Sequence, residues 1–112
     1  MVERILCAAI WYKDIPLKRV IEGVLPKNCD KGLVVLGHRH GQCIWTVISL
    51  SGFRTVKNGE DSVGEHIQGF LTNTNRFVDR YEAWEIAKTQ GQILPESLYE
   101  TRVGCLFSED LY

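Results

Sequence analysis

Apolar residues fall into short runs along the chain, separated by polar, glycine-rich or proline-containing stretches. Residues 5–12 are apolar almost without a break and end at Lys13 and Asp14. This pattern is typical of a strand that is covered on both faces, so we expect it in the middle of a sheet. Residues 33–36 form a second short run that ends at Gly37, and they predict a second strand.

The segment between these two strands predicts a short helix. Asp14 can cap its first turn, and Pro26 follows its end. Apolar residues recur between them at helical spacing, namely Leu17, Val20, Ile21 and Val24. A further apolar segment, residues 43–50, fits a helix by its spacing, but the same pattern is compatible with a strand.

The middle of the chain predicts a loop followed by a hairpin. Residues 51–65 are polar and glycine-rich, which indicates a mobile loop or a turn at Asn58 and Gly59. Residues 67–72 then predict a strand, and residues 73–78 predict a turn with an extended return.

A strong helix signal begins at Asp79. Asp79 and Glu82 have the spacing of a capping box, and Gly91 suits the left-handed conformation that ends many helices. The apolar stripe of this helix consists of Ala83, Ile86 and Ala87. Residues 103–107 could form a last strand.

Together these elements predict the α+β class, with a short β-sheet packed by two or three helices. The chain has 112 residues, a length that suits one hydrophobic core, so we expect a single domain over residues 1–112. Its composition, 45% hydrophobic and 24% charged, is that of an ordinary globular protein.

Composition also argues against several locations and partners. No stretch approaches the ~20 apolar residues that a membrane span requires, and the first residues do not resemble a secretion signal. The four cysteines are scattered without a C-x-x-C pair, which favours free thiols over a disulfide framework. We therefore expect a soluble cytoplasmic protein that makes no membrane contact.

Charge is nearly balanced overall but unevenly distributed. The net charge of −1 predicts no binding to long nucleic acid. Residues 1–58 hold nine Lys and Arg against four Asp and Glu, whereas residues 59–112 hold four against ten. Such complementarity could serve a homo-oligomer or a local anion site, although solvated charges can also segregate in this way.

The first candidate binding cluster is His38, Arg39 and His40, which join a predicted strand to a probable helix. Helix starts attract phosphate, and arginine offers a forked donor. The alternative is an exposed basic turn. A zinc site would use His38, His40 and Cys43, but no fourth ligand lies at the usual spacing, so we expect no metal.

A second candidate cluster leads into the helix that follows Asp79. Amides can read base edges, arginine can pair with phosphate, and an aromatic ring can stack on a base. Each residue also has a structural explanation as a turn former, a core residue or a solvated charge. The cluster consists of Asn73, Asn75, Arg76, Phe77 and Arg80.

Catalytic motifs are missing from the sequence. We find no phosphate-binding glycine loop, no G-x-S-x-G and no H-E-x-x-H, and so expect neither an enzyme nor a cofactor. Near the end of the chain, Ser108 with Glu109 and Asp110 could clamp a sugar hydroxyl or form a solvated end.

Several blocks of the sequence resemble a known phage family. They are Ala8-Ala9-Ile10, Gly37-His38-Arg39-His40, Gln68-Gly69-Phe70-Leu71-Thr72, residues 76–83 and residues 106–112. The blocks look like the first described family of anti-Thoeris sponges, which sequester cyclic ADP-ribose isomers made by bacterial TIR-domain defence proteins. Residues 15–30 and the step at Gln42 and Cys43 depart from that pattern.

The resemblance implies a non-catalytic α+β protein that binds a signalling nucleotide without a cofactor. It also implies a homo-oligomer, either a dimer or a hexamer with pockets between subunits, acting in the cytoplasm of the infected bacterium. Two other hypotheses stay open. The first is a small nucleotide-processing enzyme with His38 or His40 as general base. The second is a protein-interaction module in which the aromatic residues and the charge asymmetry serve a protein partner.

Overall fold

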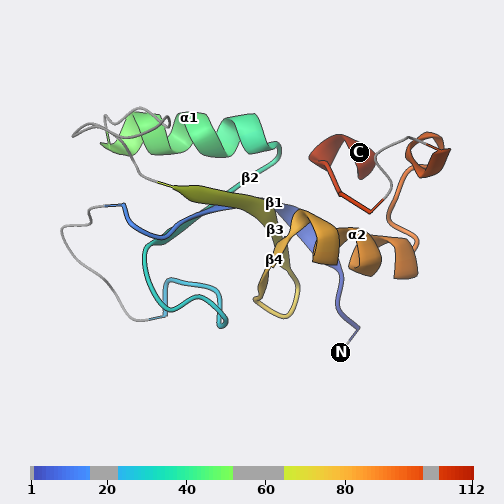
Figure 1. The fold of residues 1–112 in the computed structure, drawn as a ribbon, viewed down its shortest axis with the longest axis horizontal. Helices are drawn as coiled ribbons and strands as arrows, with labels where there is room; N and C mark the ends of the chain where they lie inside the picture. Colours follow the sequence, from blue (N-terminus) through green and yellow to red (C-terminus); the bar gives the residue numbers. More distant parts are fainter. Residues whose placement is uncertain (1, 16–22, 52–64, 100–103) are drawn as a thin grey trace.

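The computed structural model describes residues 2–15, 23–51, 65–99 and 104–112. In these ranges it contains four strands, two α-helices and two short 3-10 helices (Figure 1). In chain order they are β1 (Ile5–Tyr12), β2 (Leu33–Gly37), α1 (His40–Ser51), β3 (His66–Thr72), β4 (Phe77–Asp79), α2 (Arg80–Thr89), η1 (Pro95–Tyr99) and η2 (Ser108–Asp110). The predicted α+β class is confirmed.

The four strands form one sheet in the order β2-β1-β3-β4, and every neighbouring pair is antiparallel. The first strand pairs on both sides, for example Ala9 with Leu36 of β2 and with Gly69 of β3. The prediction of a central strand over residues 5–12 is therefore confirmed.

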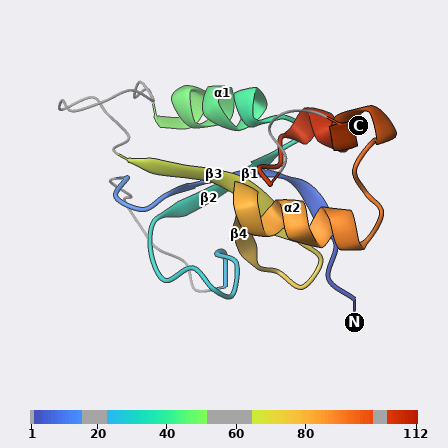
Figure 2. The same cartoon turned by 45° about the vertical axis from the view of Figure 1, so that its right-hand side comes forward.

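Both α-helices pack on the same face of the sheet. Side chains alternate along a strand, so Ala8, Ile10 and Tyr12 of β1 share this face, and all three are fully buried. They join one core cluster with side chains from both helices, including Val47 of α1 and Trp84 of α2. The segment at residues 23–32 lies on the other side of the sheet from α1 (Figures 1 and 2).

The start of α2 follows from its capping residue. The Asp79 carboxylate accepts hydrogen bonds from the backbone N–H groups of Tyr81 and Glu82, at 3.0 and 2.8 Å, as the sequence predicts. The Glu82 side chain does not complete a reciprocal box with Asp79, because it pairs with Arg76 instead. The helix ends before Gly91, which has a φ of 67° and takes the predicted left-handed conformation.

Three predicted elements differ from the structure or lie outside the described residues. Residues 43–50 are helical, and α1 begins earlier than predicted, at His40. The last strand predicted over residues 103–107 is wrong for residues 104–107, because Leu106 donates its backbone N–H to the Arg80 carbonyl oxygen beside α2 and not to a strand. Most of the helix predicted between Asp14 and Pro26, and the loop with its turn at residues 58 and 59, lie outside the described residues.

None of the helices in the described ranges has the length and apolar character needed to cross a bilayer. The four cysteines are free thiols.

Candidate functional site

The two α-helices begin next to one another, on either side of Gly69 in β3. His40, the first residue of α1, donates its Nε2–H to the Gly69 carbonyl oxygen at 2.7 Å. Asp79, which caps α2, is the sheet partner of Gly69 in β4. The first N–H groups of a helix have no carbonyl partner within it and attract anions. At α2 the Asp79 carboxylate already accepts from two of these groups, so the start of α1 is the better place for an anionic ligand.

Only glycine at position 69 allows this arrangement. A Cβ atom on Gly69 would clash with the Val78 carbonyl oxygen and would lie 2.8 Å from the Phe77 ring. Any side chain there would push β4, and with it the start of α2, away from β3.

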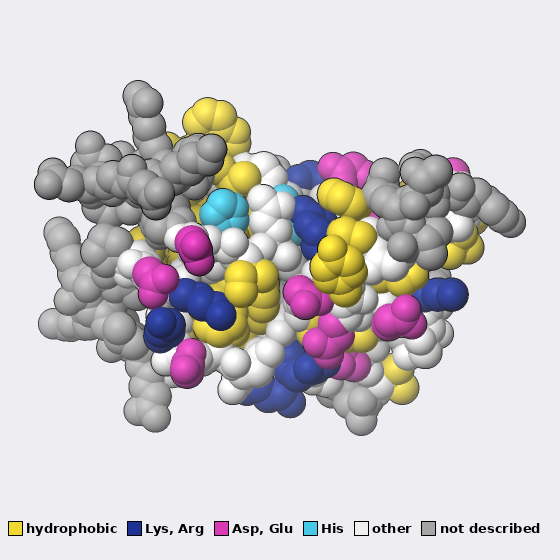
Figure 3. Space-filling view, in the orientation of Figure 1, with side chains coloured by type: hydrophobic (Ala, Val, Ile, Leu, Met, Phe, Trp, Pro, Cys, Tyr) yellow, Lys and Arg dark blue, Asp and Glu magenta, His cyan; other side chains and the backbone are white. Residues whose placement is uncertain are grey.

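A segment at residues 104–112 lies against both helix starts. Leu106 exchanges two hydrogen bonds with Arg80, the first residue of α2: its N–H donates to the Arg80 carbonyl oxygen at 2.9 Å, and its own carbonyl accepts from Nη1 at 2.8 Å. Six residues further on, Tyr112 contacts Arg39 at the start of α1. On the face viewed in Figure 3, basic and apolar side chains lie next to one another.

Arg39 combines a guanidinium group with two aromatic rings. Its Nη2 donates to the main-chain oxygen of Tyr112 at 2.5 Å, and its Cζ lies 4.9 Å from the centroid of the Tyr112 ring. The His38 ring stacks on the same tyrosine with centroids 4.4 Å apart, and the Tyr112 hydroxyl donates to the His38 carbonyl oxygen at 2.7 Å.

One nitrogen of this guanidinium group is unsatisfied. Nη1 of Arg39 is buried and has no hydrogen-bond partner among the residues that the structure describes. A buried donor without a partner costs free energy, so an incoming acceptor such as a phosphate oxygen would be favoured here.

Arg80 holds the second helix start in place. Besides its bonds to Leu106, it donates from Nη2 to Oε1 of Gln68, and its Cζ lies 4.4 Å from the Phe107 ring centroid. Each helix start thus carries an arginine next to an aromatic ring from residues 104–112.

His40 has a structural position. Its side chain is 8% exposed, and its ring lies edge-on to Phe70. Burial lowers the pKa of His40, and the nearby Arg80 charge lowers it further, while the bond to the Gly69 carbonyl opposes this shift. The imidazole is therefore neutral near pH 7 and holds the start of α1 to β3.

The second predicted cluster is divided, because only Arg80 belongs to the region around Gly69. Asn73 ties down the chain before β1: its Oδ1 accepts from the Arg4 N–H at 2.7 Å, and its Nδ2 donates to the Val2 carbonyl oxygen at 2.9 Å. Asn75 has a φ of 61° and forms the turn between β3 and β4.

Arg76 and Phe77 do not offer an exposed fork and ring. Arg76 makes ion pairs of 2.7 Å with Glu3 and 2.6 Å with Glu82, and these hydrogen bonds raise its pKa. Phe77 is 6% exposed and lies edge-on to Trp11, on the face of the sheet away from the helices. Arg76 is therefore paired with Glu3 and Glu82, and Phe77 is packed against Trp11, so neither side chain is exposed as the sequence suggested.

Ser108 is neither a surface clamp nor part of a solvated end. Its side chain is buried, with the hydroxyl 3.5 Å from an Oε2 acceptor on Glu109. The buried Asp110 carboxylate accepts from the Phe107 backbone N–H at 2.9 Å. Both residues fix the path of the segment that carries Tyr112.

Sequence reasoning missed Gln68, Phe107 and Tyr112 as neighbours of the two arginines. The sequence pointed to these residues only indirectly, through the family resemblance. Gln68 lies in its block of residues 68–72, and the two aromatic residues lie in its block of residues 106–112. Nothing in the local pattern indicates that Tyr112 contacts a residue 73 positions earlier.

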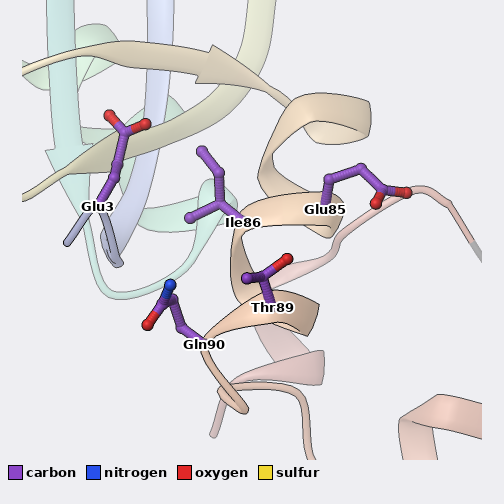
Figure 4. Close-up of a pocket in the computed structure, with 5 residues that line it drawn as sticks. All are labelled: Glu3, Glu85, Ile86, Thr89 and Gln90. Carbon is purple, nitrogen blue, oxygen red and sulfur yellow. The ribbon is translucent and has the colours of Figure 1, made fainter.

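Two shallow hollows lie elsewhere on the described surface. One, of about 260 Å³, lies beside α2 and carries two carboxylates, which disfavour an anionic ligand (Figure 4). It is lined by Glu3, Glu85, Ile86, Thr89 and Gln90. The other, of about 440 Å³, follows the outer face of α1 and is lined by Gln42, Trp45, Thr46, Ser49 and Leu50.

Within the described ranges, no three His, Cys, Asp or Glu side chains are grouped so that they could hold a metal ion. The zinc hypothesis loses two of its ligands: His40 uses Nε2 on Gly69, and the buried Cys43 thiol is directed at the Ala8 carbonyl oxygen, 3.8 Å away.

Fold and site together define a small α+β domain with a candidate anion site at Arg39, beside the start of α1. Residues 4–112 match the model of the family described as Phage T4 y16D protein, and the chain belongs to this family. It is therefore a phage protein. No curated protein and no solved structure matches the chain significantly.

Proposed function

We propose that this phage protein binds a cyclic ADP-ribose isomer, a nucleotide-type immune signal, and sequesters it without cleaving it in the cytoplasm of the infected bacterium. The observation that carries the proposal is the Arg39 guanidinium at the start of α1. One of its buried nitrogens has no partner among the described residues, and the rings of Tyr112 and His38 lie beside it.

The chemistry of such a ligand suits these groups. A cyclic ADP-ribose isomer carries a diphosphate and an adenine ring. Arginine forks bind phosphate oxygens, helix starts favour negative charge, and aromatic or guanidinium planes stack on bases. Arg39 directly precedes α1 and can supply a positive charge to the diphosphate, whereas both Nη atoms of Arg80 are bonded to Leu106 and Gln68.

Binding without cleavage needs slow release of the ligand and no stabilisation of a transition state. His40, the first candidate for a general base, is buried and bonded to Gly69, which argues against proton transfer from its Nε2. His38 is exposed, but its ring is stacked on Tyr112. These positions favour a binder over the nucleotide-processing enzyme.

A second candidate function is a protein-interaction module, favoured by the outer face of α1. Trp45 and Leu50 are 69% and 78% exposed there, and the helix His40–Ser51 contains no Asp, Glu, Lys or Arg. Such uncharged aromatic surfaces are typical of interface cores. In a sponge, the same face could join copies of the chain into the proposed homo-oligomer.

The test is retention and recovery of the ligand. The purified protein is mixed with a cyclic ADP-ribose isomer, passed through a desalting column and heat-denatured, and the released material is identified by mass spectrometry. We expect the isomer to return unchanged in a stoichiometric amount. A cleaved product would indicate an enzyme, and the absence of retained ligand would overturn the proposal.

A variant pair assigns the site. Arg39→Ala should weaken binding at least tenfold while the thermal midpoint stays near that of the parent, because the substitution keeps the backbone bonds of Arg39 to Gln42 and Cys43 and removes a side chain that contacts Tyr112. Arg4→Ala is the matched control, since this exposed arginine lies beside Asn73 and away from α1. Equal losses in both variants would contradict the assignment to Arg39.

A further inference from the structure

Tyr112 presents to Arg39 the two kinds of group that a nucleotide would present. Its main-chain oxygen accepts from the guanidinium Nη2, as a phosphate oxygen would. Its ring lies over the same guanidinium and stacks on His38, as a base would. One residue thus provides an acceptor and a flat aromatic surface together.

The tyrosine satisfies Arg39 incompletely. A single oxygen reaches Nη2, while the buried Nη1 has no partner in the described chain. A phosphate group has several oxygens and can accept from both nitrogens of the fork. The guanidinium therefore has more to gain from a phosphate than from Tyr112.

Tyr112 can also move away from Arg39 while the buried part of its segment stays in place. Leu106, Ser108 and Asp110 are at most 1% exposed, whereas Tyr112 is 40% exposed. The Asp110 carbonyl oxygen anchors the segment by accepting from the Leu94 N–H at 2.7 Å. Leu111 packs against the core and donates its N–H to the Ser108 carbonyl oxygen at 3.2 Å. Rotation of the chain after Leu111 would move the tyrosine and leave these contacts in place.

Open space lies beside the first turn of α1, which follows Arg39. A Cβ atom built on Gly41 would meet nothing within 4 Å outside the adjoining turn of the helix. A ligand that replaces the tyrosine at Arg39 can therefore extend along this turn.

We propose that Tyr112 is an internal competitor that occupies the Arg39 site and must be displaced before a nucleotide binds. This inference rests on the proposed function and adds a regulatory feature to the same site. When a competitor occupies a site, the apparent dissociation constant equals the intrinsic constant divided by the fraction of open molecules. If Tyr112 is in place nine-tenths of the time, its removal tightens binding about tenfold.

The experiment compares variants by calorimetric titration with one cyclic ADP-ribose isomer. Tyr112→Ala keeps the main-chain oxygen but removes the ring and the hydroxyl that hold this residue beside His38 and Arg39. It should lower the dissociation constant by about tenfold, which corresponds to about 1.4 kcal/mol. Tyr112→Phe keeps the ring but loses the hydroxyl that donates to His38, so a smaller gain is expected. Tyr81→Ala is the matched control, because Tyr81 is 69% exposed on α2 and away from Arg39.

A second measurement follows the tyrosine itself. Protein labelled with 3-fluorotyrosine gives a fluorine resonance for Tyr112, assigned by its loss in Tyr112→Phe. Addition of the isomer should move this resonance toward the position of an exposed tyrosine, while the Tyr81 resonance stays in place.

The outcomes separate the inference from the function on which it rests. If the parent binds and Tyr112→Ala binds equally or more weakly, Tyr112 is not a competitor and the inference is overturned, while the proposed function stands. If neither the parent nor Tyr112→Ala binds the isomer, the proposed function fails and the inference fails with it. Tighter binding by Tyr112→Ala together with a moving fluorine resonance supports both.

Discussion

Replacing Glu3 by Gln tests how strongly the chain before β1 is tied to the β3-β4 turn. The Glu3 carboxylate accepts from Nε and Nη2 of Arg76, at 2.9 and 2.7 Å. It also accepts from the hydroxyls of Thr74 and Thr72, at 2.5 and 2.8 Å. Glutamine keeps the size of the side chain but removes the charge and one of the acceptor oxygens.

The magnitude follows from the pKa of this carboxyl group and from its exposure. The hydrogen bond from Arg76, followed by that from Thr74, lowers the pKa of Glu3 from 4.5 to about 2. Because the pKa is lower in the folded protein, the carboxylate stabilises the fold above about pH 4.5 and loses this effect as the pH falls through about 2. The side chain is 24% exposed and partly screened by solvent, so we expect a contribution of about 1–2 kcal/mol.

Urea unfolding at several pH values measures this contribution. At pH 7, Glu3→Gln should lower the free energy of unfolding by about 1–2 kcal/mol. The difference in the free energy of unfolding between variant and parent should shrink as the pH falls from 4.5 toward 2. Over this range the Glu3 carboxylate of the parent becomes protonated and loses its charge, so it comes to resemble the neutral glutamine. Glu85→Gln is the control, since no ion pair of the exposed Glu85 is found in the described chain. A difference that stays constant between pH 7 and pH 2 would refute the reasoning.

Two further predictions concern stability. Asp79→Ala removes the acceptor for the N–H groups of Tyr81 and Glu82, so the free energy of unfolding should fall by about 1 kcal/mol and the thermal midpoint by about 4 °C. An unchanged midpoint in a calorimetric scan would show that the cap is not needed. Tyr12→Phe removes a fully buried hydroxyl without a partner among the described residues, so chemical denaturation should show a gain of about 1 kcal/mol. A loss of similar size would mean that the hydroxyl is satisfied in solution.

Much of the fold could be predicted because its signals are local. The apolar run at residues 5–12 matches β1 from end to end, and the cap at Asp79 marks the start of α2. Residues 43–50 left helix and strand open, because their apolar residues fit both periods. Packing decided between them, since Cys43 and Val47, one helical turn apart, both lie in the core on the sheet.

The site could be predicted only in part, because its second half comes from far along the chain. The basic character of His38 and Arg39 at a strand-to-helix junction is visible in the sequence and is found in the structure. Their aromatic neighbour Tyr112 is not visible, since no periodicity links residues more than 70 positions apart. Similarly, the two helix starts come close together only because residue 69 is glycine. The sequence alone could not predict this requirement, because it depends on the carbonyl oxygen of Val78 in the neighbouring strand.

Arg39 and Arg76 show why local chemistry alone could not rank the candidates. Both lie shortly before a helix, and both can bind phosphate by residue type. Arg76 has two carboxylates within 2.7 Å. A phosphate would have to displace Glu3 and Glu82 from Arg76, and the negative charges of both carboxylates would oppose its binding. The Arg39 guanidinium has the ring and one main-chain oxygen of Tyr112 against it, with Nη1 still unpartnered in the described chain. Because no side-chain carboxylate among the described residues pairs with Arg39, it is the better anion receptor of the two.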